Sequence, residues 1–304
     1  MTICVVGAGA IGSLFAAHLA SVADVQVLTR RSEHAAALNE HGLRVTGRSD
    51  FTARVAATAD PADLREFDLA IIATKATGLE EAARSLSGRF EGATIMTVQN
   101  GLGAEEIVGR HGDWPLVSAV TFMSGTKHSD THVEYILDTP TWLGPYGDTP
   151  YEQVQAIAET IVDGGLKAEA LKDLRPAQWS KLIFNATVNG VSALTRLPHD
   201  AHFAAEGEPS DLGHVVHALV DEGKQVAASV GVRLHDDPWE MNVLATKRGA
   251  AHYPSMLEDV EGQRPTEVEL INGALVREGA SAGVEVPLQT ALYHLVRAKE
   301  RSYS

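Results

Sequence analysis

The stretch Val6-Gly7-Ala8-Gly9-Ala10-Ile11-Gly12 decides how the first part of this chain folds. It follows the apolar run Ile3–Val6, which has the composition of a buried strand, and it leads into Ile11–Ala20, a run of small and apolar residues typical of a helix. The spacing G-x-G-x-x-G between a strand and a helix predicts the tight turn that opens a Rossmann-type domain.

Each glycine of this turn has its own physical purpose. The first permits the tight turn, the second lets a pyrophosphate approach the backbone, and the third lets the helix pack close to the strand. The helix then presents free N–H groups and the positive end of its dipole to an anion. A turn without a ligand is the alternative, but the context favours a bound dinucleotide, with contacts from Gly7, Ala8, Gly9, Ala10, Ile11 and Gly12.

Short runs rich in Val and Ile alternate with helical stretches through the first half of the chain. Such continuous apolar runs indicate strands buried on both faces of a parallel sheet that helices cover. The further expected strands are Val25–Thr29, Leu69–Thr74, Ala93–Val98 and Leu116–Phe122, with a helix over Gly78–Ser87. Val133–Leu137 and Thr141–Leu143, with Pro140 between them, are expected to form an antiparallel pair.

The pattern changes near Asp173, where long amphipathic helical stretches replace the strands. The expected helices are Gln178–Leu194, Leu212–Val230, Pro238–Arg248 and Thr266–Ala282, and helix starts are expected at Pro176, Pro238, Pro265 and Pro287. The fold class is therefore expected to be α/β, with a doubly wound Rossmann-type domain over residues 1–172 and an all-α domain over residues 173–304.

The composition excludes several classes of protein. With 304 residues, 44% of them hydrophobic, the chain can bury a core without disulfides or metal, and its only cysteine, Cys4, is expected to be a buried hydrophobe. A net charge of −15, acidic on both sides of Lys172, argues against a nucleic acid or an anionic membrane as partner. No metal-ligand spacing, membrane span or basic signal-peptide start occurs, so a cytoplasmic location is expected.

The residues after two of the expected strands bear on the choice of dinucleotide. An acidic residue at the end of the second strand would bind the ribose of NAD, whereas an arginine there would accept the 2′-phosphate of NADP. The chain has Arg30 and Arg31 at this place and no acidic residue before Glu33, which favours NADP. Lys75, after Leu69–Thr74, adds a second cation; solvated side chains are the alternative for both positions.

Asn100 follows the strand Ala93–Val98 in the run Gln99-Asn100-Gly101-Leu102-Gly103. Because ligands of such sheets bind at the carboxyl ends of the strands, Asn100 is a candidate to hydrogen-bond a cofactor or a substrate. Asn-Gly is also a common turn, so a purely local role is the alternative.

Lys181, Asn185 and Asn189 are spaced by four and form a polar stripe on one expected helix. The residues around them, W-S-K-L-I-F-N-A-T-V-N-G over 179–190, are largely apolar, so much of this helix is expected to be buried. Burying a lysine or an amide without a partner costs roughly several kcal/mol, and a ligand would supply that partner. An exposed face is the alternative, although asparagine is a mediocre helix former.

Two further runs are Pro254-Ser255-Met256-Leu257-Glu258-Asp259 and P-T-E-V-E-L-I-N-G at 265–273. With these runs and the motifs above, the chain resembles the ketopantoate reductase (2-dehydropantoate 2-reductase) family, within the 6-phosphogluconate dehydrogenase-like group. By themselves the last two runs indicate only helix caps, at Ser255 and in a capping box of Thr266 with Glu269. The resemblance covers essentially the full length. It implies an active site in a cleft between two domains and NADPH-dependent reduction of a 2-oxo acid, foremost 2-dehydropantoate to pantoate.

The resemblance also implies roles for individual residues. Lys181 matches the family's catalytic lysine, the expected general acid, and Glu267 its essential glutamate. The remaining matches are substrate contacts at Asn185, Asn189 and Ser255, a contact to both substrate and cofactor at Asn100, contacts to the 2′-phosphate at Arg30 and Lys75, and a cofactor contact at Ser124.

The chain departs from the family pattern at a few places. Phe122 and Met123 are bulkier than the residues usual after the sixth strand, and His199 and His252 stand where some relatives carry Asn. A larger oxo acid or an imine is therefore the alternative substrate, and a non-catalytic dinucleotide sensor is the alternative function. A homodimer is a possible assembly.

Overall fold

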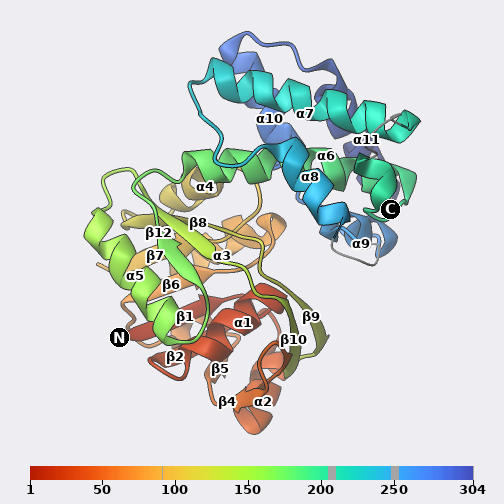
Figure 1. The fold of residues 1–304 in the computed structure, drawn as a ribbon. Coiled ribbons are helices and arrows are strands. Elements are labelled where there is room, and N and C mark those ends of the chain that lie inside the picture. The colour runs from red at the N-terminus through yellow and green to blue at the C-terminus, as the bar shows by residue number, and fades with distance from the viewer. Residues whose placement is uncertain (91, 205–209, 248–252, 304) are drawn as a thin grey trace. The chain divides into compact units, whose positions relative to one another are not determined.

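The computed structural model describes residues 1–90, 92–204, 210–247 and 253–303, and the contacts divide the chain into two compact units (Figure 1). Unit 1 comprises Met1–Gln99 and Ala104–Leu174. Unit 2 comprises Arg175–Ser304 together with the short segment Asn100–Gly103. The chain thus contributes four residues of its first half to the unit built by its second half.

An eight-stranded sheet forms the centre of unit 1, in the order β12-β11-β8-β7-β6-β1-β2-β5. All neighbours from β5 to β8 are parallel, and their order is the doubly wound 3-2-1-4-5-6 arrangement. The expected α/β Rossmann-type fold is confirmed. The strands are β1 (Thr2–Val6), β2 (Asp24–Leu28), β5 (Ala56–Thr58), β6 (Leu69–Ile72), β7 (Thr94–Thr97), β8 (Leu116–Thr121), β11 (Thr141–Tyr146) and β12 (Ala168–Ala170).

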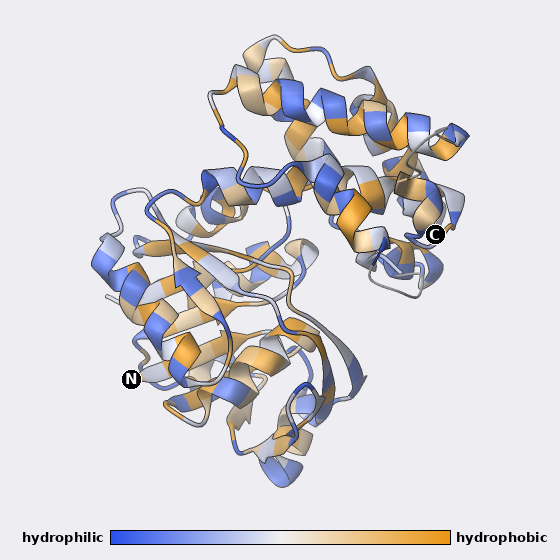
Figure 2. Ribbon diagram, viewed as in Figure 1, coloured by the Kyte–Doolittle hydropathy of each residue, from blue (hydrophilic) through white to orange (hydrophobic). Residues whose placement is uncertain are grey.

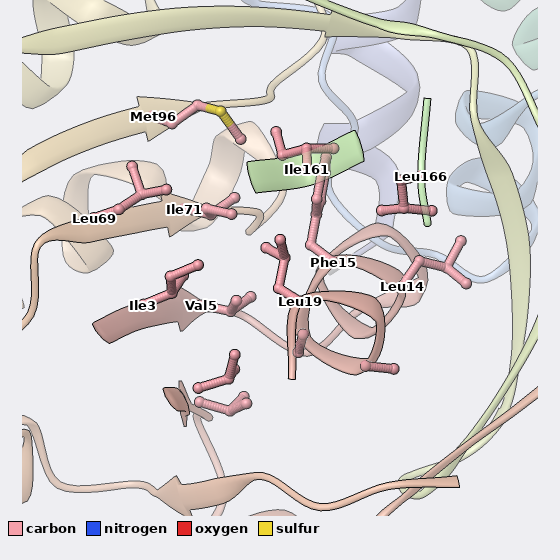
Figure 3. Packing of buried hydrophobic residues seen from close by; sticks show 14 of the residues in the cluster. Ile3, Val5, Leu14, Phe15, Leu19, Leu69, Ile71, Met96, Ile161 and Leu166 are labelled. Atoms are coloured by element: carbon pink, nitrogen blue, oxygen red, sulfur yellow. The ribbon is translucent and has the colours of Figure 1, made fainter. Parts of the chain in front are cut away.

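Helices cover this sheet, and the central strands are buried along their length, as their continuous apolar composition predicts. Figure 3 shows Phe15 and Leu19 beside Val5 and Ile71 of the sheet and Ile161 of another helix, all members of one apolar cluster. Cys4 lies in β1 with no exposed surface, and burial raises the pKa of its thiol to about 12. The helices of unit 1 are α1 (Ala10–Leu19), α2 (Ser32–His41), α3 (Leu79–Leu86), α4 (Ala104–Gly109) and α5 (Tyr151–Asp163).

A second, four-stranded sheet in unit 1 corrects one expectation. Its order is β4-β3-β10-β9, from β4 (Phe51–Ala53), β3 (Leu43–Gly47), β10 (His132–Leu137) and β9 (Ser124–Ser129). The expected antiparallel pairing of Val133–Leu137 with Thr141–Leu143 is wrong, because β10 pairs with β9 and β3 whereas β11 pairs with β8 and β12. Val133 and Tyr135 of β10 are buried in the cluster around α1, and this burial draws β10 away from the main sheet.

Unit 2 is helical in the described residues, as expected, and Figure 2 shows its helices banded in polar and apolar residues. One apolar cluster includes Leu182 and Ile183, and a second includes Val216 and Phe203. Pro238 and Pro287 begin their helices at the first position, where the missing N–H costs nothing. The helices are α6 (Arg175–Thr195), α7 (Asp211–Ser229), α8 (Pro238–Thr246), α9 (Ser255–Glu261), α10 (Asn272–Ala282) and α11 (Pro287–Glu300).

The expected helix over Thr266–Ala282 is shorter than its sequence pattern suggests. Helix α10 starts at Asn272, and the residues from Thr266 to Ile271 form turns instead, so Pro265 does not start a helix. The amide and hydroxyl of Thr266 both donate to the Glu300 carboxylate of α11, at 2.6 and 2.7 Å. These bonds replace the expected capping box with Glu269 and hold the segment Thr266–Ile271, the 266–271 turn, outside the helix.

Within the described ranges, no helix combines the length and the apolar character that crossing a membrane requires.

Candidate active site

The glycine turn has the geometry of a phosphate-binding turn. It connects β1 to α1, with Gly7 at a φ of +97° and its amide bonded to the Leu28 carbonyl of β2. A Cβ on Gly12 would lie 1.9 Å from the Gly7 oxygen, so only glycine allows this approach of helix to strand. A Cβ on Gly9, in contrast, would meet nothing within 4 Å.

That open space adjoins the N-terminus of α1, where Gly9 is the N-cap and no side chain caps the helix. The protein itself therefore leaves room for a group at the turn, and the first N–H groups of α1 suit an anion. The residues present fit the pyrophosphate of a dinucleotide.

Arg30 and Lys75 are both exposed; Arg30 lies two residues beyond the end of β2 and Lys75 three residues beyond the end of β6. These strands flank β1 in the sheet, so both cations belong to the edge that carries the glycine turn. The Gln99 side chain, which the sequence did not single out, donates to the carbonyls of Ile72 and Thr74 at 2.8 and 3.0 Å and so anchors the end of β6. The positions of Arg30 and Lys75 at this edge of the sheet suit the recognition of an adenosine 2′-phosphate.

The polar stripe expected on one helix exists on α6. Asn185 and Asn189 are buried, Lys181 is half-buried, and their apolar neighbours Leu182 and Ile183 pack in the core of unit 2. Burial lowers the pKa of the Lys181 ammonium to about 8, while the nearby Glu267 carboxylate opposes that shift. Lys181 is thus an ammonium group that can lose its proton near neutral pH.

Asn100 links this stripe to Glu267. Its amide nitrogen donates to a Glu267 carboxylate oxygen at 2.9 Å, and its amide oxygen lies 3.5 Å from the Asn185 nitrogen. The structure therefore brings Asn100, Asn185, Glu267 and Lys181 together within unit 2. Sequence spacing alone does not predict this, since 167 residues separate Asn100 from Glu267.

Docking of the segment Asn100–Gly103 on the 266–271 turn holds Asn100 in place. The Leu102 amide donates to the Leu270 carbonyl at 2.9 Å. Gly101 has a φ of +100°, and a Cβ there would lie 1.9 Å from the same Leu270 oxygen. The Asn-Gly pair lies in a bend of the backbone, and the segment that contains it belongs to unit 2.

Ser255 is exposed at the first position of α9, and Pro254, not Ser255, is the N-cap. Met256 and Val260 of α9 share a core cluster with Leu182 of α6. The helix of Ser255 therefore packs in the same core as the helix of Lys181.

The residues at which the chain departs from the family pattern have separate environments. Met123 is buried in the apolar cluster of unit 1, Phe122 packs edge-on against Trp142, and Ser124 begins β9. His199 is buried, with its Nε2 2.7 Å from the Asn242 amide oxygen. His252 lies outside the described residues.

The glycine turn of unit 1 suits the phosphates of a dinucleotide, and the cluster around Lys181 in unit 2 suits delivery of a proton. Of the described residues, no three His, Cys, Asp or Glu side chains are arranged to hold a metal ion. The charged and polar groups of the site are instead a lysine of shifted pKa, one carboxylate and several amides, which suits acid–base chemistry on a polar substrate.

Comparison with known proteins points in the same direction. Two family models match, ketopantoate reductase PanE/ApbA over residues 3–148 and its C-terminal counterpart over residues 173–300. A 2-dehydropantoate 2-reductase of Archaeoglobus fulgidus is 31% identical over 299 residues, 97% of each chain. One from Halobacterium salinarum is 30% identical over 306 residues, 99% of each chain.

Solved structures agree in fold over the full chain. A PanE/ApbA family ketopantoate reductase from Ralstonia eutropha has a TM-score of 0.89 at 25% identity, covering 100% of this chain and 99% of the other. D-mandelate dehydrogenase, solved with NADH and anilino(oxo)acetate, has a TM-score of 0.90 at 26% identity with the same coverage. The chain therefore belongs to the ketopantoate reductase family, a family of oxidoreductases.

Proposed function

We propose that this protein uses NADPH to reduce a 2-oxo acid to a 2-hydroxy acid, with 2-dehydropantoate as the substrate and Lys181 as the general acid. Relatives named 2-dehydropantoate 2-reductase, matched over nearly their whole length, support the substrate. Arg30 at the end of β2, where an NAD-binding domain carries an acidic residue, supports NADP. The observation that carries the proposal is the cluster on unit 2 in which Glu267 accepts the Asn100 amide hydrogen bond at 2.9 Å and lies near the Lys181 ammonium, whose pKa burial lowers to about 8.

Unit 1 would hold the cofactor. The glycine turn and the first turn of α1 would bind the pyrophosphate, and Arg30 and Lys75 the 2′-phosphate. Ala8, Ala10, Ile11 and Ser124 complete the proposed cofactor site on this unit, and Asn100 is a further proposed cofactor contact. When bound, the reduced nicotinamide supplies a hydride for the substrate carbonyl carbon.

Lys181 would act on the carbonyl oxygen. Negative charge grows there during reduction, and the ammonium stabilises it and then transfers a proton from Nζ to the oxygen. A lysine with an unshifted pKa would be a weaker acid, so burial of Lys181 in α6 improves proton transfer near neutral pH.

The amides and the carboxylate would orient the reactants. Asn185, Asn189 and Ser255 would bind the carboxylate and hydroxyl of the substrate, and Glu267 would keep Lys181 protonated through their attraction. Because Glu267 also accepts the amide hydrogen bond of Asn100, one carboxylate couples the proton donor to Asn100.

The test is a matched series of oxo acids. We would measure kcat/KM for 2-dehydropantoate, other branched 2-oxo acids and the oxo acid of mandelate, each with NADPH and NADH. The proposal expects the highest value for 2-dehydropantoate with NADPH. A higher kcat/KM for a larger oxo acid would show that 2-dehydropantoate is not the preferred substrate. The similarity to D-mandelate dehydrogenase supports this alternative. Tight NADPH binding without turnover of any oxo acid would make the protein a dinucleotide sensor.

A further inference from the structure

A lysine of the four-stranded sheet contacts the glycine turn. Lys127, in β9, donates from its Nζ to the Ala8 carbonyl at 2.9 Å. This contact joins residues 119 positions apart, and the polar sequence of β9, Ser-Gly-Thr-Lys-His-Ser, gives no sign of it. The side chain of Lys127 is 27% exposed, so most of its surface is covered.

A compact group of side chains holds the ammonium in place. One Asp130 carboxylate oxygen lies 3.3 Å from Nζ, and the Arg31 guanidinium donates to both oxygens of that carboxylate at 2.6 and 2.7 Å. His34 lies with its Nε2 3.3 Å from Nζ and 2.9 Å from the Asp130 carbonyl. Asp130 therefore balances two cations and fixes Lys127 beside the turn.

The bond to Ala8 matters because of the peptide that it engages. The Ala8 carbonyl and the Gly9 N–H belong to one peptide group, and in a trans peptide the two point in opposite directions. Holding the oxygen therefore fixes the direction of the Gly9 N–H. A charged donor on the oxygen also polarises the peptide and makes its N–H a stronger donor.

The Gly9 side of the turn is where the protein leaves open space, since a Cβ there would meet nothing within 4 Å. An anion bound in that space would lie against the N-terminus of α1 and the peptide that Lys127 polarises.

We propose that Lys127 is a positioning residue for the dinucleotide pyrophosphate, acting through the Ala8–Gly9 peptide of the glycine turn. The inference rests on the proposed function, because it requires that this turn bind a dinucleotide. It adds a second residue of β9, beside Ser124, to a site otherwise built around the main sheet. The two neighbouring arginines then have different roles. Arg31 pairs with the Asp130 carboxylate, whereas Arg30 is proposed to bind the 2′-phosphate.

The experiment compares two ligands by calorimetry, without turnover. NADP contains both the pyrophosphate and the 2′-phosphate, whereas 2′-AMP contains only the latter. We expect Lys127→Met to raise the Kd of NADP about tenfold, the usual effect of losing a charge-assisted hydrogen bond, and to change the Kd of 2′-AMP less than about twofold. Arg30→Met should weaken both ligands, and Lys127→Arg should restore much of the NADP affinity.

Lys167→Met is the matched control. Lys167 also pairs with a carboxylate of unit 1, that of Asp138 at 2.7 Å, so this variant removes the same charge elsewhere. It should leave both affinities unchanged. If Lys127→Met lost the same affinity for both ligands, or lost no affinity for NADP, the inference would be overturned and the proposed function would stay intact. Failure of the unaltered protein to bind NADP would overturn both.

Asp130→Asn provides a second route if Lys127→Met does not fold. It leaves the lysine in place but removes the carboxylate that holds it. The Kd of NADP is expected to rise about threefold, with no loss of 2′-AMP affinity. Unchanged NADP affinity in Asp130→Asn would also count against the inference.

Discussion

Lys181 lies on a largely buried helix, beside a carboxylate that opposes the lowering of its pKa by burial. If it is the general acid, Lys181→Ala should bind NADPH with nearly unchanged affinity, because the cofactor residues proposed on unit 1 are untouched. Turnover should fall by about 10²–10⁴, the usual contribution of a positioned acid. Steady-state rates and cofactor titration check this together, and near-normal turnover would remove Lys181 from the mechanism.

The pH dependence of reduction should report the same group. A general acid must be protonated, so kcat/KM should be level below the Lys181 pKa of about 8 and fall as the pH rises through it. Glu267→Gln keeps an acceptor for Asn100 but removes the charge that raises this pKa, so the fall should begin at a lower pH.

Glu269→Gln is the control for that shift. Glu269 belongs to the same 266–271 turn but is half-exposed and pairs with Arg277 and Arg297. Its neutralisation should leave the pH profile in place. If the pH dependence of kcat/KM shifted equally in both variants, the shift would come from the loss of any nearby negative charge and not from the loss of Glu267 in particular.

Stability should reveal what the buried ammonium costs. The pKa of Lys181 is about 8 in the folded protein, below the ordinary value of 10.5. Below pH 8 the side chain is charged in both the folded and the unfolded state, so the full cost of burying the charge is present. This cost decreases as the pH rises above 8 and is absent above 10.5. Lys181→Met should therefore increase the free energy of unfolding at pH 7, by on the order of 1–2 kcal/mol. The gain should shrink between pH 8 and pH 10.5 in denaturant titrations, and a gain that is constant across this range would contradict the explanation.

At the scale of elements, the glycine turn separates residues needed for folding from those needed for binding. Gly9→Ala meets open space and an ordinary backbone conformation, with φ at −73°, so it should lower the stability by less than about 1 kcal/mol. The added methyl group enters the proposed phosphate space, so the Kd of NADP should rise at least about tenfold. Gly12→Ala is the contrast, since its Cβ would collide with the Gly7 oxygen and disrupt the fold itself. Unchanged NADP affinity in Gly9→Ala would exclude this turn from the cofactor site.

Elements were predicted well where one local pattern dominates. The Val and Ile runs gave the parallel strands, and the Lys181–Asn185–Asn189 spacing gave the stripe on α6. The pattern failed at the 266–271 turn, where tertiary hydrogen bonds to Glu300 and Leu102 hold residues of helical periodicity outside the helix. This break precedes α10 and leaves Glu267 in the turn that accepts the bond from Asn100.

At the scale of the whole molecule, each unit has apolar packing of its own, with Phe15 in a cluster of unit 1 and Leu182 and Val216 in clusters of unit 2. The chain is therefore expected to unfold in more than one step. A dinucleotide at about 100 times its Kd should stabilise the step of unit 1 by about 2.7 kcal/mol. Hydrogen exchange followed by mass spectrometry would locate the protection in unit 1, and protection confined to unit 2 would contradict the assignment of the cofactor residues.

The acidic balance of the whole chain is consistent with local binding of an anionic cofactor. At a net charge of −15 the average field repels a phosphate-rich ligand, so the cations near the glycine turn and at the ends of β2 and β6 must act at short range. Arg30 and Lys75 were recognisable as candidates because they directly follow expected strands. Lys127 was not, since no strand was expected around it.

The sequence by itself determined the Rossmann-type turn, the parallel strands and the polar stripe of α6, because each depends on residues within a few positions of one another. Only the tertiary structure decided that Asn100 meets Glu267, that β10 leaves the main sheet and that Lys127 reaches the glycine turn. Those contacts join residues far apart in the chain. Which residues meet depends on how the sheets and helices pack to bury their apolar faces, and a local sequence pattern does not contain this information.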